Sequence, residues 1–123
     1  MFTVLDALVN LETRQVTYEA TLDLLHRNPD LKGIFVAGGG MEGAIQAVKE
    51  MRKPGEVSLV VNELTEISTM ALQEHYVTLV DATPLAKLCG KLVDGMVKSA
   101  TEGISDTTGQ IFLQPDLFVP ESV

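Results

Sequence analysis

The 123-residue sequence predicts an α/β fold, in which a parallel sheet is flanked by helices on both faces. Short apolar runs alternate along the chain with longer stretches whose apolar residues recur at helical spacing. The apolar runs lack regular polar alternation, which is typical of parallel strands that are covered on both sides. With 46% apolar residues the chain can bury a core, so wholesale disorder is excluded.

The first four strand–helix units follow in chain order. We expect strands at residues 2–7, 33–37, 57–62 and 77–80. The helices between them should bury stripes formed by Tyr18, Thr21, Leu22 and Leu25, by Met41, Ala44, Ile45, Val48 and Met51, and by Ile67, Met70 and Ala71. Residues 10–13 provide the turn and cap before the first helix. Pro29 and Pro54 end the first two helices because proline cannot continue the hydrogen-bond ladder, and Thr65 is a candidate N-cap for the third.

The last part of the chain predicts the longest helix and two short extended pieces. Thr83 and Pro84 open this helix as N-cap and first helical residue. Its apolar stripe is Leu85, Leu88, Cys89, Leu92, Val93, Met96 and Val97. Gly103 should stop the helix before a polar loop at residues 104–109. Residues 110–113 and 117–119 are then extended, and Pro115 between them belongs at an edge or a bulge.

Composition and charge exclude several classes of function. The net charge is −8 and no basic block exists, so the chain by itself is a poor nucleic-acid surface. The single cysteine rules out a disulfide framework and a cysteine-based zinc site. No apolar run approaches the ~20 residues of a membrane span, and no signal-peptide pattern opens the chain. We expect no metal, no cofactor and no membrane partner.

One motif has a direct chemical interpretation. Residues 38–43 (GGGMEG) satisfy G-x-G-x-x-G between a predicted strand and a helix, and Glu63 follows about 20 residues later. Backbone N–H groups of such a turn can face a pyrophosphate, and the acid can accept from ribose hydroxyls. However, the fingerprint normally belongs to the first strand of its unit, and here a strand–helix pair precedes it. Three interpretations stay open: a dinucleotide site, a site for another small ligand, and glycines that only permit a tight turn.

Five segments, in the right order, resemble the effector-binding core of the LacI/GalR family of bacterial repressors. They are YEATLDLL at 18–25, NPDLKGIF at 28–35, GEVSLVV at 55–61, TPL to LVD at 83–94, and IFLQPDLFVPES at 111–122. The resemblance implies part of a type I periplasmic-binding-protein-like fold, whose two subdomains enclose a sugar or a similar effector. Residues 1–123 would form a single partial effector-binding domain from the C-terminal subdomain. The helix at 83–103 would normally pack on an N-terminal subdomain that this chain does not contain.

The resemblance also implies a function. The chain would be the sugar- or metabolite-sensing part of a cytoplasmic LacI-type regulator, in which ligand binding shifts subdomain closure and operator affinity. DNA would be bound only through a helix-turn-helix absent from this chain, and no enzyme activity is expected. The alternatives are a periplasmic sugar-binding protein of an ABC transporter and a dinucleotide-binding enzyme fragment. Without its partner subdomain, the helix at 83–103 should fold back on its own sheet or be exchanged with a second copy, giving a homodimer or domain-swapped oligomer.

The candidate ligand-binding residues come from the carboxyl ends of the predicted strands, where such sheets bind ligands. Glu63 matches an aspartate that accepts from sugar hydroxyls in the family, and Asn62 stands where the family has an aromatic residue. Charge-assisted hydrogen bonds make such a carboxylate a good sugar ligand. The alternative for Glu63 is a solvated loop acid.

The remaining candidates lie in the other loops at the same edge. Gly38 and Gly39 occupy the place of an Asn-Asp pair that contacts the effector in the family, and Glu42 can supply a carboxylate nearby. Asp81 and Thr83 lie at the crossover, where Thr83 matches a family glutamine. Glu42 can equally be an acid favoured by the helix dipole, and Thr83 an ordinary N-cap, which we favour.

Overall fold

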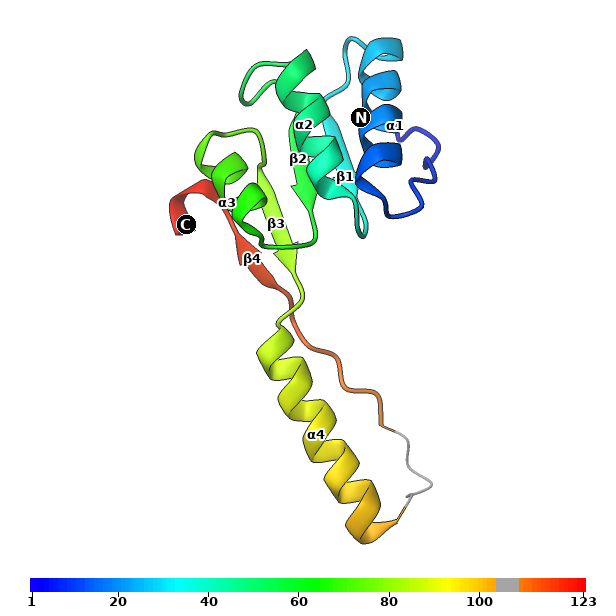
Figure 1. Cartoon of the computed structure of the whole chain (residues 1–123), viewed down its shortest axis with the longest axis vertical. Helices are drawn as coiled ribbons and strands as arrows, with labels where there is room; N and C mark the ends of the chain where they lie inside the picture. The colour runs from blue at the N-terminus through cyan, green and yellow to red at the C-terminus, as the bar shows by residue number, and fades with distance from the viewer. Residues whose placement is uncertain (104–108) are drawn as a thin grey trace.

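A computed structural model describes residues 1–103 and 109–123, and its centre is a four-stranded sheet in the order β1-β2-β3-β4. The strands β1 (Gly33–Val36), β2 (Ser58–Val61) and β3 (Leu79–Ala82) are parallel, whereas β4 (Asp116–Phe118) runs antiparallel to β3 (Figure 1). The predicted α/β class is confirmed. The antiparallel edge strand is the exception to the parallel sheet that the sequence predicts.

Three helices cover one face of this sheet: α1 (Arg14–Arg27), α2 (Met41–Met51) and α3 (Glu66–Gln73) (Figure 1). Their buried side chains form a single core with one alternating set of strand residues, namely Val36, Leu59, Val61, Val80 and Ala82. The connections from β1 to β2 and from β2 to β3 advance in the same direction across the sheet. Because such crossovers are right-handed, they place their helices on the same side. The sheet is therefore flanked by helices on one face, and no helix among the described residues covers the opposite face, which we expected to be covered as well.

The predicted stripe of α2 is buried except for Met51, which is exposed: Met41, Ala44, Ile45 and Val48 are all buried. In α3 only Ala71 of the predicted stripe is buried. Ile67 and Met70 are 40% and 50% exposed, and Ser68 and Leu72 are buried in their place. Thr65 caps α3 by accepting a hydrogen bond from the backbone N–H of Ser68, as expected.

In α1 the predicted burial of Thr21 and Leu25 is confirmed, Leu22 is only half-buried, and Thr17 is buried in addition. Thr17, Thr21 and Leu25 are buried, and both threonine hydroxyls donate to backbone carbonyl oxygens one turn earlier at 2.7 Å. This local bond removes the cost of burying the hydroxyl. Tyr18 stays at the surface instead and donates to the carboxylate of Glu50 at 2.6 Å.

The prediction of a strand at residues 2–7 is wrong for this structure. Residues 1–9 have no regular structure, and Phe2 and Val4 are 93% and 91% exposed. An apolar composition favours a strand, but a strand also needs a neighbouring backbone with which to form hydrogen bonds. The sheet order ends at β1, so no strand among the described residues pairs with the outer edge of β1.

The helix α4 (Leu85–Glu102) leaves the sheet and projects away from the core (Figure 1). None of its residues is buried, so the expectation that it folds back on its own sheet is wrong. Residues 110–113 return beside it without forming a strand, and β4 and the short 3₁₀ helix η1 (Pro120–Ser122) follow. The polar loop predicted at residues 104–109 falls, except for Gly109, outside the described residues. Within the described parts, no helix is long and apolar enough to cross a membrane.

Candidate functional site

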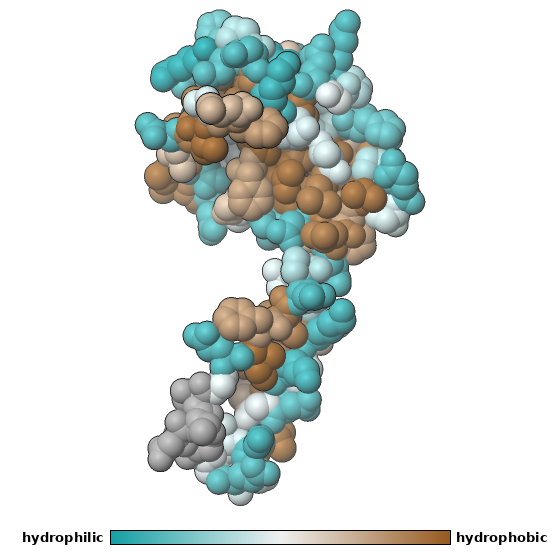
Figure 2. Space-filling view, turned by 180° about the vertical axis from the view of Figure 1, so that it is seen from behind, coloured by the Kyte–Doolittle hydropathy of each residue, from teal (hydrophilic) through white to brown (hydrophobic). Residues whose placement is uncertain are grey.

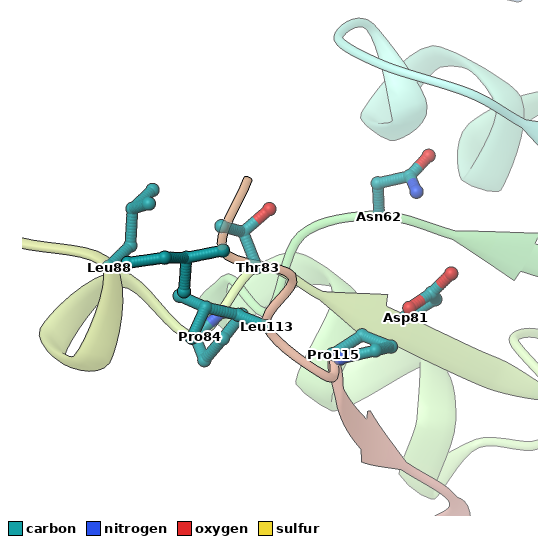
Figure 3. A pocket seen from close by; sticks show the side chains of 8 residues that line it. Asn62, Asp81, Thr83, Pro84, Leu88, Leu113 and Pro115 are labelled. Carbon is teal, nitrogen blue, oxygen red and sulfur yellow. The ribbon is translucent and has the colours of Figure 1, made fainter. Parts of the chain in front are cut away.

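We call the sheet together with α1, α2 and α3 the body of the protein. A cavity of about 340 Å³ lies where this body meets α4 (Figure 3). Three polar residues that the sequence singles out line it, namely Asn62, Asp81 and Thr83. The remaining lining residues are apolar: Pro84, Leu88, Ile111, Leu113 and Pro115. The cavity is open to solvent and is lined by both polar and apolar side chains.

The parallel pairing of β2 and β3 explains why Asn62 and Asp81 are neighbours. Val61 pairs with Val80, and the next residue of each strand therefore continues at the same level and on the same side of the sheet. Both side chains extend to the same side of the strands in Figure 3. Ends of adjacent parallel strands are the usual ligand-binding edge of an α/β sheet.

Asn62 holds the neighbouring loop as well as lining the cavity. Its Oδ1 accepts a hydrogen bond from the backbone N–H of Gly38 at 3.0 Å. The Nδ2 group is then the part of the amide that can donate to a ligand. Asn62 thus links the end of β2 to the turn after β1, and the sequence gives no sign of this second role.

Thr83 is not the N-cap that we favoured from the sequence. The helix begins at Leu85, Pro84 is its N-cap residue, and no side chain caps it. Instead, the backbone carbonyl of Thr83 accepts from the N–H of Leu85 at 2.8 Å. The hydroxyl of Thr83 is therefore not used for capping and lines the cavity.

The other predicted site residues lie outside this cavity. Glu63 is exposed, and it is its carbonyl oxygen that is held, by the hydroxyl of Ser68 at 2.8 Å. Glu42 lies half-buried in the first turn of α2, where a carboxylate complements the helix dipole. Gly38 and Gly39 form the turn after β1 and do not line the cavity; Gly38 donates its N–H to Asn62, and the carbonyl of Gly39 accepts from the side-chain amide of Asn10.

The glycine-rich turn has a structural explanation. Gly38 and Gly40 adopt φ of 129° and 84°, which side chains disfavour. A Cβ on Gly38 would lie 2.6 Å from the Glu12 carboxylate, and one on Gly40 would lie 2.2 Å from the Thr17 hydroxyl. The carboxylate of Glu12 therefore occupies the space beside the turn and would repel a phosphate there. This geometry favours the tight-turn interpretation over a pyrophosphate cradle.

The apolar wall of the cavity is the part that sequence reasoning missed. Leu88 appears in the sequence only as one member of a helical stripe, and Leu113 and Pro115 as short extended pieces. The signal that was available is the pair of prolines, because Pro84 and Pro115 interrupt the two segments that join the body to α4. Among the described residues, no group of three or more His, Cys, Asp or Glu side chains could hold a metal ion.

Comparison with solved structures places this fold among known proteins. The chain is similar to GanP, a glucose-galactose binding protein from Geobacillus stearothermophilus, with a TM-score of 0.79, 13% identity and coverage of 93% of this chain and 40% of that chain. The XylFII–LytSN complex matches with a TM-score of 0.78, 16% identity and 98% and 42% coverage. A periplasmic sugar-binding protein from Pseudomonas fluorescens matches with a TM-score of 0.69, 24% identity and 91% and 36% coverage. No protein-family model and no curated protein matches the sequence.

These similarities define the class of fold. The chain has the α/β architecture found in periplasmic-binding-protein-like structures. It spans about two fifths of the length of the solved chains that it matches. At these identities the comparisons show the fold alone.

Proposed function

We propose that this chain is the sugar-sensing part of a LacI-type transcriptional regulator, and that its ligand is a neutral carbohydrate. The observation that carries the proposal is the convergence of Asn62, Asp81 and Thr83 on one cavity. They supply an amide, a carboxylate and a hydroxyl from the ends of two adjacent strands. Hydrogen bonds of this kind, with a charged acceptor among them, suit the hydroxyl groups of a sugar.

The apolar lining of the cavity supports the same ligand class. Leu88, Leu113 and Pro115 line the same cavity as the polar side chains, and Leu88 lies on the far side from Asn62 and Asp81 in Figure 3. Sugar rings carry polar hydroxyls at their edges and C–H groups on their faces, so a site lined by both polar and apolar side chains matches both. Binding pockets for small molecules commonly combine apolar walls with a few placed polar groups.

The opening of the cavity supports a role in a longer protein. One wall belongs to the sheet, and the other belongs to α4 and the segment that returns from it. In our proposal the chain is one partial effector-binding domain, residues 1–123, and a further subdomain on α4 closes over the ligand. Closure that favours the bound state would then shift a two-state equilibrium and change operator affinity through a DNA-binding part elsewhere. A cytoplasmic location belongs to this proposal.

Calorimetric titration with a panel of neutral monosaccharides tests the binding site. We expect a saturable heat with at least one sugar, and a loss of affinity of about tenfold or more in Asp81→Asn, since a charged hydrogen bond contributes about 1.5–3 kcal/mol. Asp30→Asn is the matched control, because Asp30 lies before β1 at the opposite edge of the sheet. Equal affinities of the Asp81 and Asp30 variants would refute the assignment.

The same titration separates the remaining site candidates. Glu63→Gln should leave sugar affinity unchanged if the cavity is the site, and should reduce it if the loop beyond β2 closes onto the ligand. NAD should give no heat, since Glu12 stands beside the glycine turn. Binding of NAD without sugar binding would favour the dinucleotide-binding enzyme over both sugar proposals.

A second candidate function is a periplasmic sugar-binding protein of an ABC transporter. The observation that favours it is the similarity to a solved periplasmic sugar-binding protein from Pseudomonas fluorescens. The coding sequence upstream of Phe2 distinguishes the two candidates. A helix-turn-helix followed by a further subdomain supports the regulator, and a signal peptide supports the transport protein.

A further inference from the structure

The side-chain amide of Asn62 has one orientation that satisfies its neighbour. The backbone N–H of Gly38 lies 3.0 Å from this amide, and because a backbone N–H can only donate, the amide oxygen must face it. The turn that carries Gly38 is itself held, since the side-chain amide of Asn10 donates to the carbonyl oxygen of Gly39 at 3.0 Å. A flipped amide would set Nδ2 against the N–H of Gly38, donor against donor. Asn62 therefore presents a donor on its other side.

The carboxylate of Asp81 supplies the complementary group. Val61 and Val80 are paired in register, so the residues that follow them, Asn62 and Asp81, stand at the same level of adjacent strands. In Figure 3 the nitrogen of the Asn62 amide lies toward Asp81 and the oxygen lies away from it. Asp81 is the one charged residue among the described residues that line the cavity, and an ionised carboxylate can only accept. The cavity thus offers a donor and an acceptor with a fixed order.

We infer that Asn62 and Asp81 together recognise one hydroxyl group of the ligand, whose oxygen accepts from Nδ2 of Asn62 and whose proton is donated to the carboxylate of Asp81. We call these two residues the hydroxyl pair. A hydroxyl both accepts and donates through a single oxygen, so it satisfies both residues at once. This inference rests on the proposed function and names the chemical group by which the site selects a sugar.

The spacing of the strands fits one hydroxyl between these side chains. Adjacent strands lie about 4.8 Å apart. A hydroxyl oxygen that accepts at about 2.9 Å and donates at about 2.7 Å, with about 109° between the two bonds, separates the donor nitrogen from the acceptor oxygen by about 4.6 Å. The two separations agree within the freedom of the side-chain torsions, so a hydroxyl can join Asn62 to Asp81 without any movement of β2 or β3.

The hydroxyl pair rejects groups that carry only part of this chemistry. An ether or carbonyl oxygen accepts from Asn62 but gives Asp81 no proton, and an ammonium group donates to Asp81 but meets Nδ2 donor against donor. A phosphate or carboxylate is repelled by the charge of Asp81.

Water competes with every such ligand group. Figure 2 shows mostly hydrophilic and neutral side chains in the region where the body meets α4, whereas hydrophobic side chains gather on the body and along α4. The cavity in this region is open to solvent, so water can occupy both members of the hydroxyl pair when no ligand is bound. A ligand group that satisfies only one of them therefore loses affinity relative to water.

Exchanging the two side chains tests the hydroxyl pair, because a bound hydroxyl can turn and reverse its donor and acceptor roles. The proteins to compare are the unaltered chain, Asn62→Asp, Asp81→Asn and the double variant that carries both changes. The double variant keeps one amide and one carboxylate but reverses their positions. Asn62→Asp retains an acceptor for the N–H of Gly38, so the urea midpoints of all the variants should stay near that of the unaltered chain.

Calorimetric titration with D-glucose, D-galactose, D-xylose and D-ribose measures the affinities. We expect Asn62→Asp to lose about tenfold or more in affinity, because two carboxylates then compete for the one proton of the hydroxyl, and Asp81→Asn to lose about tenfold. The double variant should recover to within about threefold of the unaltered chain, as expected of residues that share one hydrogen-bonded group. Gln73→Glu is the control for the added charge and should bind normally, since Gln73 is exposed at the end of α3 and does not line the cavity.

Three results would overturn the inference. Losses that simply multiply in the double variant would show that Asn62 and Asp81 act on separate groups of the ligand. Full affinity in Asn62→Asp would show that the amide does not donate to the ligand. Both of these results leave sugar binding by the unaltered chain in place. An absence of heat from the unaltered chain with every one of the sugars would instead refute the proposed function, and the hydroxyl pair with it.

Discussion

At Gly43 the backbone of α2 lies directly against the backbone of α1. A Cβ atom at this position would stand 2.1 Å from the carbonyl oxygen of Arg14 and 2.7 Å from the backbone nitrogen of Tyr18. Both neighbours are backbone atoms, so no side-chain rotation can relieve the clash. To restore ordinary contact the two helices would have to separate by about 1 Å.

We therefore expect Gly43→Ala to lower the free energy of unfolding by about 2 kcal/mol. Overpacking of this kind costs about 1–3 kcal/mol or more, and the better helix propensity of alanine offsets about 1 kcal/mol of it. With a urea m-value of about 1–3 kcal/mol/M, the midpoint should fall by about 1 M. Equilibrium unfolding in urea, followed by circular dichroism at 222 nm, measures it.

The control for Gly43→Ala is the same substitution at Gly90. A Cβ at Gly90 in α4 meets nothing within 4 Å, so alanine there should stabilise the helix by about 0.5–1 kcal/mol. If Gly43→Ala behaved like Gly90→Ala, the close approach of α1 and α2 would be refuted, and the third glycine of the G-x-G-x-x-G motif would need another explanation.

Three further outcomes follow from the packing and the hydrogen bonds. The hydrogen bond from Tyr18 lowers the pKa of Glu50. The stabilisation from this bond is therefore present above the ordinary carboxyl pKa and is lost as pH falls through the lowered pKa. Tyr18→Phe should reduce the urea midpoint at about pH 7 but not at about pH 2. Leu59→Ala removes a side chain that is 0% exposed. The free energy of unfolding, measured by thermal or urea unfolding, should fall by about 2–5 kcal/mol. Asn62→Ala takes the acceptor from the Gly38 N–H and should cost about 1–3 kcal/mol, whereas Asn62→Asp retains an acceptor and should unfold near the wild-type midpoint.

The helices show what the sequence can predict. In α2 the apolar residues Met41, Ile45 and Val48 recur at helical spacing, and the same residues are buried. The pattern succeeds there because burial follows from the period of one contiguous segment. In α1 the pattern finds Thr21 and Leu25 but misses Thr17, which is buried because its hydroxyl donates to the carbonyl oxygen of Thr13 within the helix.

Features that depend on distant segments could not be predicted in the same way. The apolar run at residues 2–7 has the composition of a strand, but no local pattern reveals whether a neighbouring strand exists. The antiparallel direction of β4 depends on how the chain returns from α4, which is a matter of topology.

In the candidate site too, the residues that follow strands could be predicted, and those that come from distant segments could not. Asn62, Asp81 and Thr83 were predicted because they follow apolar strands, and the ends of parallel strands share one edge. The apolar wall was missed because α4 and residues 111–115 approach that edge only in three dimensions.

Two prolines at the cavity restrict the backbone of the segments that join the sheet and its helices to α4. Pro84 and Pro115 lie in the two segments that connect the body to α4, and both line the same cavity. Each proline fixes one backbone angle of its segment, and two such connections side by side resist twisting about their common direction more than bending across it. We therefore expect the connection between the sheet and α4 to bend more readily than it twists. A small change in the separation of the two segments would then become a large displacement at the far end of α4 (Leu85–Glu102).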